Sequence, residues 1–154
     1  MTLSIRQATP DDAAGLANLV TQLGYPSSSE QVAARLTSLQ SADDRLLVAE
    51  TDGVAVGLAH VNRWANLVVD NRAEIVALVV DDKWRGQGIG RALLQAAEEW
   101  ATQRGCSALQ VRTNIVRQRA HEFYFQNGFR QAKTSLTLVK QLVGSQAVAN
   151  SAGA

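Results

Sequence analysis

Three glycines stand at the start of a segment that otherwise has the pattern of a helix, DDKWRGQGIGRALLQAAEEW, residues 81–100. Gly86, Gly88 and Gly90 each weaken a helix by roughly 0.5–1 kcal/mol relative to alanine. A helix N-terminus presents unpaired N–H groups and the positive end of the helix dipole, and a missing Cβ lets phosphate oxygens reach the backbone. The segment therefore predicts a phosphate site. The alternative is a glycine-rich turn needed only for close packing of helix against strand.

Two common phosphate loops do not fit this segment. The dinucleotide fingerprint GxGxxG requires glycine at the position of Arg91. A P-loop requires a Gly-Lys-Ser or Gly-Lys-Thr triplet, and the sequence contains neither. The neighbouring segments must therefore identify the phosphate.

Tyr124 is a candidate general acid, and it lies between Phe123 and Phe125 on a predicted helix. Consecutive helix residues point about 100° apart, so the three rings cannot share one face. We expect one phenylalanine to pack in the core while Tyr124 faces a cleft. The alternative is a tyrosine used only for packing.

Glu74 is a candidate general base on the predicted strand AEIVALVV. Strand alternation places it on the face of Val76, Leu78 and Val80, where little solvent would raise the pKa of a carboxyl group. The alternative is a strand-end carboxylate in water or paired with Arg72.

The other reactive side chains have simpler interpretations. His60 lies on a hairpin strand in register with Val56 and Leu58, where a lone histidine is more often a satisfied core residue than a base. His121 is expected on the surface or in packing. Cys106 is the only cysteine, so the chain can form no internal disulfide and no thiolate metal site. We expect no metal ion.

The elements that position these residues follow from hydrophobic periodicity and from turn and capping residues. We expect a strand, two helices, three strands, a helix, a strand, a helix and a last strand, which is a mixed α/β domain. The boundaries come from a strand at Leu3 and Ile5, a helix from Thr9 to Gly24, a helix capped within 27–29, a hairpin at Asp52-Gly53, strands at 73–80 and 107–113, helices ending at Gly105 and Asn127-Gly128, and a last strand at 136–142.

Composition indicates an ordinary globular chain. Its 154 residues are 46% hydrophobic and 19% charged, with a net charge of +1. These values predict one domain at 1–143, followed by a tail of small residues at 144–154 that we expect to be flexible. Neither a basic stripe for nucleic acid nor an apolar run of about 20 residues for a membrane is present. We expect a cytoplasmic protein that binds neither.

Two segments together resemble the GNAT N-acetyltransferases. AEIVALVVDDKWRGQGIGRALL is similar to the family's central strand, its pyrophosphate loop R/Q-x-x-G-x-G/A and the following helix, and RQRAHEFYFQNGF is similar to a later helix. The resemblance extends from residue 3 to about 140. It implies an α/β (α+β) fold, with a mixed, mostly antiparallel sheet, about four flanking helices, and strands that splay around 76–81 and 107–113.

The resemblance also implies a reaction. The family transfers the acetyl group of acetyl-CoA to a primary amine by direct attack in a ternary complex. Tyr124 stands where the family has its general acid, and the spacing of Glu74 to Arg85 matches a glutamate base. A backbone N–H near Val79 would polarise the thioester. The implied acetyl-CoA contacts are Leu78, Val79, Val80, Arg85, Gly86, Gln87, Gly88, Ile89, Gly90, Arg91, Asn114 and Arg117. Arg117 occupies the position of an asparagine in many relatives, and Asn114 precedes it by three residues.

The acceptor amine is expected to bind between segments 22–30 and 62–72. The candidate substrate residues are Tyr25, His60, Trp64 and Asp70. The carboxylates Asp70 and Glu74 suit a cationic acceptor, which includes amino sugars, polyamines and peptides. The alternative is a non-catalytic acetyl-CoA-binding regulatory domain. Because the family often forms homodimers, the last strand is also a candidate to pair with a second subunit.

Overall fold

The computed structural model describes residues 2–143, so the predicted tail at 144–154 lies outside the described residues. The described chain forms a five-stranded sheet with four α-helices and two short 3₁₀ turns. In chain order these are β1 (Leu3–Gln7), η1 (Pro10–Asp12), α1 (Ala13–Leu23), α2 (Ser29–Ser38), β2 (Asp44–Thr51), β3 (Val54–Trp64), β4 (Arg72–Val80), η2 (Asp82–Trp84), α3 (Ile89–Gln103), β5 (Leu109–Val111) and α4 (Gln118–Gln126).

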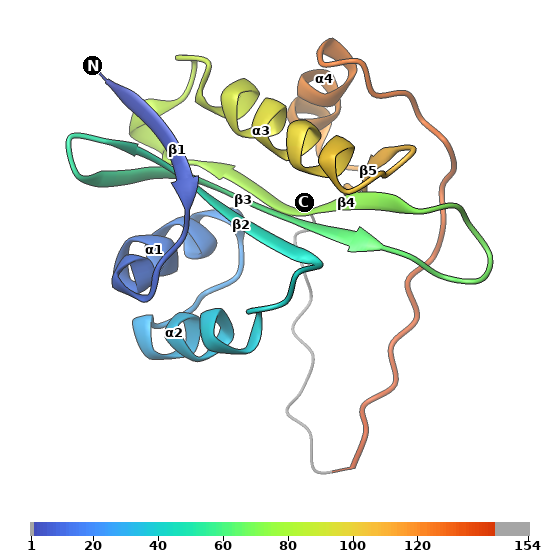
Figure 1. Ribbon diagram of the computed structural model, residues 1–154, viewed down its shortest axis with the longest axis horizontal. Coiled ribbons are helices and arrows are strands. Elements are labelled where there is room, and N and C mark those ends of the chain that lie inside the picture. Colours follow the sequence, from blue (N-terminus) through green and yellow to red (C-terminus); the bar gives the residue numbers. More distant parts are fainter. Residues whose placement is uncertain (1, 144–154) are drawn as a thin grey trace.

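The strands lie side by side in chain order, and the predicted mixed sheet is confirmed. Strands β1 to β4 pair antiparallel, while β5 runs parallel to β4. Helices α1 and α2 cover one face of the sheet, and α3 and α4 lie on the other (Figure 1). The loop between β4 and α3 therefore opens at the edge where β4 and β5 end.

The predicted helix ends are confirmed, but Thr9 caps the 3₁₀ turn η1, and α1 itself begins at Ala13. Ser28 caps α2, since its hydroxyl accepts from the Gln31 N–H at 3.1 Å and the Gln31 side chain accepts from the Ser28 N–H at 2.9 Å. Gly24 ends α1 with a φ of 115°, a conformation that favours glycine.

A β-bulge divides β4 into two segments. Val61 of β3 pairs with Ile75, but His60 pairs with Ala77, so Val76 is an extra residue on β4. Ile75 and Leu78 consequently both pack in the cluster under α3, although they are an odd number of positions apart. Glu74 lies on the opposite face, which α1 and α2 cover only in part. The predicted shared face of Glu74, Leu78 and Val80 is therefore wrong.

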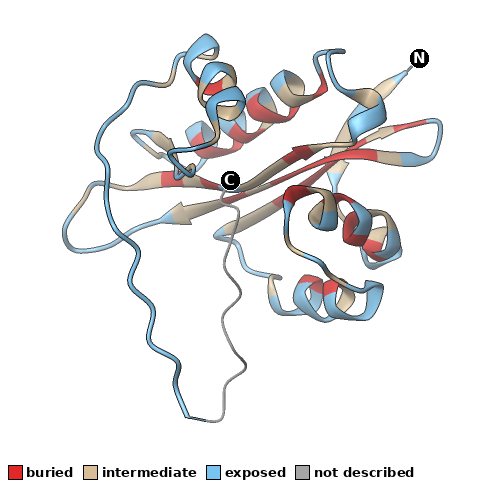
Figure 2. Ribbon diagram, turned by 180° about the vertical axis from the view of Figure 1, so that it is seen from behind, coloured by how far each residue is buried: buried red, intermediate tan, exposed pale blue. Residues whose placement is uncertain are grey.

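Buried side chains line both faces of the sheet and the facing sides of the helices (Figure 2). Under α1 and α2 they include Leu16, Leu19, Leu36, Val48 and Leu58. Under α3 they include Ile75, Ile89, Leu93, Leu94 and Ala97. Within residues 2–143 no helix combines the length and apolar character that crossing a membrane requires.

The predicted last strand at 136–142 is wrong for the single chain. Among the described residues, none after Val111 belongs to a strand, and the segment from 130 runs away from the sheet (Figure 1). Leu136 and Leu138 are 87% and 88% exposed. Alternating apolar residues form a strand only where a neighbouring strand offers hydrogen bonds, and within residues 2–143 no strand pairs with residues 136–140.

Candidate active site

The glycine loop connects the end of β4 to the start of α3. Gly86 and Gly88 have φ values of 78° and 81°, which only glycine adopts without strain, and Gly88 is the N-cap of α3. A Cβ at either position would meet no atom within 4 Å, so the space before the loop is open. A Cβ at Gly90 would instead lie 3.3 Å from the Phe123 ring. The packing alternative therefore accounts for Gly90 and not for the other two glycines.

A cavity of about 850 Å³ extends from this loop to α4. Its walls include most of the residues predicted to bind acetyl-CoA, together with the predicted acid. These are Leu78, Val79, Val80, Arg85, Gly86, Gly88, Ile89, Gly90, Arg91, Arg117 and Tyr124. A volume of this size is typical of small-molecule sites.

The predicted splay between β4 and β5 is confirmed and forms one side of the cavity. The two strands pair only from Ala73 to Ile75 on β4, so the edge of Leu78–Val80 is unpaired on that side. The Asp81 N–H donates to Val56 of β3 at 2.9 Å, whereas the Val80 carbonyl accepts from Arg85 at 3.4 Å. Because successive N–H groups point to opposite edges, Leu78 and Val80 present theirs to the cavity and Val79 presents its own to β3.

Tyr124 is buried in the wall of the cavity, with 5% of its surface exposed. Burial raises the pKa of the Tyr124 phenol to about 12, and the charge of Arg117 lowers it by less. The Phe123 and Phe129 rings meet the Tyr124 ring edge-on at 5.2 Å and 5.3 Å, while Phe125 is 54% exposed. The three consecutive aromatic residues thus point in different directions, as expected.

The raised pKa of Tyr124 predicts a stability change at high pH. An unfolded tyrosine loses its proton near pH 10 and the folded one near 12, so this stabilisation is complete below pH 10 and is lost as the pH rises to 12. Two pKa units correspond to roughly 2–3 kcal/mol. Urea denaturation between pH 10 and 12 should show that the wild type loses this much more unfolding free energy than Tyr124→Phe. Equal losses would contradict the prediction.

Glu74 is held by two partners on β5 and the residues after it. Arg112 Nε and Gln110 Nε2 each lie 2.8 Å from Glu74 Oε1. The pairing with Arg72 that the sequence left open is not present, since Arg72 donates to Gln110 at 3.1 Å. Both contacts to Glu74 fall on one oxygen, so Oε2 is the atom that remains for substrate or water.

The predicted acceptor residues are only partly brought together. The Arg112 guanidinium carbon lies 5.2 Å from the Trp64 ring centroid, which joins Trp64 to Glu74 through one side chain. His60 lies on the same sheet face, with Nε2 2.8 Å from Asp44 Oδ1.

Two other predicted acceptor residues lie outside this group. Tyr25 packs against the core under α1 and α2, and Asp70 is exposed in the β3–β4 loop.

Sequence reasoning missed Arg112, Gln110 and Asp44. The signal for the first two was available, because they alternate on an otherwise apolar strand and must therefore share one face. The contact between Asp44 and His60 joins two strands and has no local signal.

Arg117 and Asn114 have different positions relative to the cavity. Arg117 lines it at the start of α4 and donates to the Leu23 carbonyl at 3.2 Å. Asn114 instead holds the preceding loop, since its side chain accepts from the Val116 N–H at 3.1 Å and its carbonyl lies 2.9 Å from His121 Nε2. His121 is thereby explained as a structural residue.

A family model described as "Acetyltransferase (GNAT) family" matches residues 15–129, which include the glycine loop, Glu74 and Tyr124. The chain belongs to the GNAT acetyltransferase family. The predicted resemblance is confirmed.

Named relatives of this GNAT chain are N-acetyltransferases. Aminoglycoside N(6′)-acetyltransferase type 1 of Stenotrophomonas maltophilia is 32% identical over 84% of this chain and 88% of the relative. Aminoalkylphosphonate N-acetyltransferase of Salmonella typhimurium is 32% identical over 86% of this chain and 88% of the relative. The GNAT chain is accordingly an N-acetyltransferase.

A solved structure supports the GNAT fold. Aminoglycoside N-acetyltransferase AAC(6′)-Iy in complex with CoA matches 92% of this chain and 96% of that chain, with a TM-score of 0.82 and 20% identity. The likeness shows the fold.

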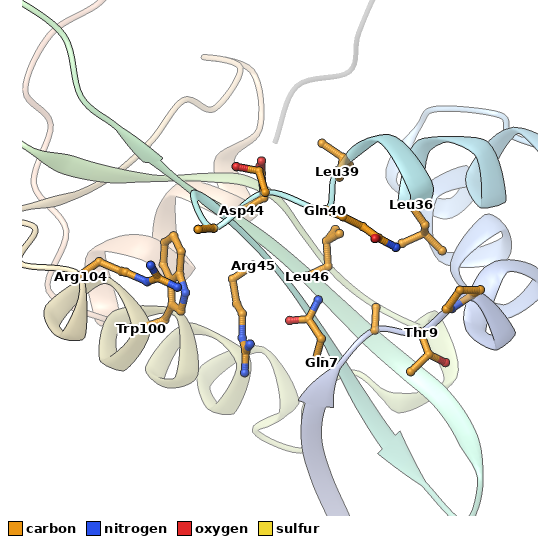
Figure 3. A pocket seen from close by; sticks show the side chains of 14 residues that line it. Gln7, Thr9, Leu36, Leu39, Gln40, Asp44, Arg45, Leu46, Trp100 and Arg104 are labelled. Carbon is orange, nitrogen blue, oxygen red and sulfur yellow. The ribbon is translucent and has the colours of Figure 1, made fainter.

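The GNAT domain has a second cavity of about 360 Å³ (Figure 3). It lies apart from the glycine loop and Tyr124. Leu36 and Leu39 border it on one side, and Trp100 and Arg104 on the other. The Arg104 guanidinium carbon stands 5.5 Å from the Trp100 ring centroid. None of the predicted site residues lines this cavity.

Proposed function

We propose that this GNAT enzyme transfers the acetyl group of acetyl-CoA to a primary amine by direct attack within a ternary complex. The observation that carries the proposal is the 850 Å³ cavity, which joins the glycine loop to Tyr124 along the unpaired edge of β4. One ligand that is anionic at one end and extended along its length fits these walls.

The walls supply three kinds of contact to acetyl-CoA. N–H groups of residues 85–90 and the charges of Arg85 and Arg91 bind the pyrophosphate. The free edge of Leu78–Val80 pairs with the pantetheine arm as another strand would. Either the Leu78 or the Val80 N–H, rather than that of Val79, faces the thioester carbonyl and stabilises the oxyanion.

The reaction needs a neutral amine. A lysine-like ammonium has a pKa near 10.4, so about one molecule in a few thousand is neutral at pH 7, and removing the proton costs roughly 4–5 kcal/mol. The neutral nitrogen attacks the thioester carbon, the C–S bond breaks, the amide forms, and the second nitrogen proton passes through water to the coenzyme A thiolate, which leaves beside Tyr124. Glu74 Oε2 takes a proton directly or through water.

Glu74→Gln should lower kcat about 10–100-fold at pH 7, because an amide cannot accept the ammonium proton. The defect should shrink as the pH approaches 10, where the amine loses its proton unaided. Thiol release measured from pH 6 to 10 tests this dependence. Glu99→Gln, an exposed glutamate on α3, is the matched control. A defect that is constant with pH would assign Glu74 to structure instead.

The acceptor is proposed to be a cationic amine. Glu74, Asp44 and Trp64 share one face of the sheet, outside the lining of the 850 Å³ cavity, and carboxylates with an aromatic ring suit a cation. The relatives named above act on aminoglycosides and aminoalkylphosphonates by their names. Both acceptor classes carry primary amines, so both belong in the first screen.

Thiol release from acetyl-CoA tests the function directly. Purified protein is incubated with separate pools of aminoglycosides, aminoalkylphosphonates, polyamines, amino acids and short peptides. Release with one pool establishes the acceptor class. Acetyl-CoA binding without release in any pool would favour the alternative, a non-catalytic acetyl-CoA-binding regulatory domain.

The same proposal places the enzyme in the cytoplasm as a homodimer. Its net charge of +1 offers no attraction to nucleic acid or to an anionic membrane surface. Cys106 is free, and burial raises the pKa of its thiol, which keeps it in the unreactive protonated form. A chain with this single thiol suits a reducing compartment.

A further inference from the structure

The second cavity lies where β1 leaves the sheet. The pairing of β1 with β2 ends at Gln7 and Leu47, and Ala8 makes the last contact by donating its N–H to the Leu46 carbonyl at 2.8 Å. Because β2 already begins at Asp44, its first residues have no strand beside them on that edge. The ends of α2 and α3 border this region, and a cavity of about 360 Å³ lies between them (Figure 3). The volume is near the lower end of the range for small-molecule sites.

Arg45 gives the cavity a cation that lacks a partner. Strand alternation places Arg45 on the face of Leu47, which packs under α3. Arg45 is partly buried, and within residues 2–143 its guanidinium makes no hydrogen bond or ion pair. A guanidinium withdrawn from water usually has such a partner. The N–H groups of Arg45 are therefore available to an anionic ligand.

Trp100 supplies a second unpaired donor to the same cavity. The residue is only 7% exposed, yet its indole Nε1–H has no hydrogen-bond acceptor in the part of the chain that the structure describes. A buried indole N–H usually finds one. The Arg104 guanidinium lies over the Trp100 ring, with its carbon 5.5 Å from the ring centroid. A guanidinium that stacks through its face keeps its N–H edge for a carboxylate.

The charges of the cavity wall favour an anion. Asp44 is the only carboxylate among the described lining residues, and its Oδ1 contacts His60 Nε2 at 2.8 Å. Asp44 also lies on the opposite face of β2 from Arg45. A helix end explains only one of the two arginines, since Arg104 is the C-cap of α3, where a cation is stabilising, whereas Arg45 belongs to a strand. The wall thus offers cationic donors that no protein acceptor uses.

The other wall of the cavity is apolar. Leu36 and Leu46 are 9% and 8% exposed, and Leu39 lines the cavity beside them (Figure 3). Burying apolar groups of a ligand against these side chains is favourable. Apolar residues on one side and guanidinium groups on the other suit a molecule that is charged at one end and apolar over the rest.

We propose that this cavity binds a small carboxylate with an apolar body. The carboxylate accepts hydrogen bonds from Arg45, Arg104 and the Trp100 Nε1–H, while the body packs on the leucines. No residue lines both this cavity and the one assigned to acetyl-CoA, so the two ligands can be bound at the same time. The proposal does not depend on acetyl transfer, which keeps its own assay.

Isothermal titration compares benzoate with benzamide, its neutral isostere. Wild type should bind benzoate with a Kd of about 1 mM or below, and benzamide about tenfold more weakly or worse. Arg45→Met keeps much of the side-chain volume but removes the charge, so it should weaken benzoate binding about tenfold. No binding of benzoate, equal affinity for the two probes, or unchanged affinity in Arg45→Met would overturn the proposal.

Arg35→Met is the matched control for the loss of a cation. Arg35 is an exposed arginine on α2 that donates to Ser27 Oγ at 3.0 Å and does not line the cavity. This variant should bind benzoate as wild type does. An equal loss of affinity in Arg35→Met and Arg45→Met would show that net charge, and not this cavity, attracts the probe.

A second experiment locates benzoate in the wild-type protein and does not depend on the folding of a variant. Trp84 lines the acetyl-CoA cavity, Trp100 lines the second cavity and Trp64 lines neither. In protein with isotope-labelled tryptophan, benzoate should shift the nuclear magnetic resonance signal of the Trp100 indole N–H and leave that of Trp84 in place. The same shift should appear with acetyl-CoA bound.

The variants Trp64→Phe and Trp84→Phe assign the three indole signals. Acetyl-CoA is the positive control, since it should shift the Trp84 signal. A benzoate shift at Trp84 instead of Trp100, or a Trp100 shift that acetyl-CoA abolishes, would assign benzoate to the acetyl-CoA cavity and overturn the second site.

Discussion

Tyr124→Phe is expected to lower kcat about 10²–10³-fold while the KM for acetyl-CoA changes little. The phenol has a pKa of about 12, so it holds its proton at every working pH. A departing thiolate, with a pKa near that of cysteine at about 8.5, is a weaker base than the tyrosinate. The hydroxyl therefore acts chiefly by donating a hydrogen bond as charge develops on sulfur, which sets the effect below the upper limit for full proton transfer.

The measurement is steady-state thiol release with the acceptor found in the pooled screen. Phe125→Leu is the control, because Phe125 adjoins Tyr124 on α4 but is 54% exposed. It should keep kcat within about threefold of wild type, the scale of a surface change. If Tyr124→Phe also stayed within threefold, Tyr124 would be a packing residue.

Gly88→Ala is expected to raise the KM for acetyl-CoA about 10–100-fold. The new Cβ would point into the open space before the loop, where the pyrophosphate is proposed to bind. Loss of one charge-assisted hydrogen bond costs about 1.5–3 kcal/mol, and 1.4 kcal/mol corresponds to a factor of ten. Isothermal titration with acetyl-CoA measures the loss without any acceptor.

Gly105→Ala is the matched control for this substitution. Gly105 has a φ of 73°, and a Cβ there would also meet nothing within 4 Å, but the residue follows the far end of α3. Both variants should lose about 1–2 kcal/mol of unfolding free energy from backbone strain. Only Gly88→Ala should weaken acetyl-CoA binding. Equal affinities would show that the pyrophosphate does not use this loop.

Local signals predicted the elements that position the site. Ser28 and Gly24 mark helix ends through capping and a positive φ, both of which depend on residues close in the chain. The glycine loop could be predicted for the same reason, because β4, the loop and the start of α3 follow one another directly in the sequence. Helix geometry predicted that the three consecutive aromatic rings point in different directions, and the family resemblance selected Tyr124 as the one that faces the cleft.

What the sequence did not predict depends on pairing between distant residues. The extra residue Val76 leaves no mark in an apolar strand, because Ile75, Val76 and Ala77 look alike to a period-two pattern. The partners of Glu74 come from β5, more than 30 residues away. Apolar residues alternate at 136–142 as they do in a strand, but strand pairing requires a sheet edge that the local sequence does not reveal.

Because β4 contains the extra residue Val76, the number of residues in this strand determines which face of the sheet Glu74 and Ile75 occupy. Deleting Val76 would restore the regular alternation of side chains along β4. The C-terminal part of β4, which leads into α3, is held in place by the packing of Leu78 and Ile89. The N-terminal part would then have to turn over. Ile75 would leave the core, and the Glu74 carboxylate would enter an apolar cluster at a cost of several kcal/mol. A homologous chain one residue shorter at this point would therefore need the proposed catalytic carboxylate at another position.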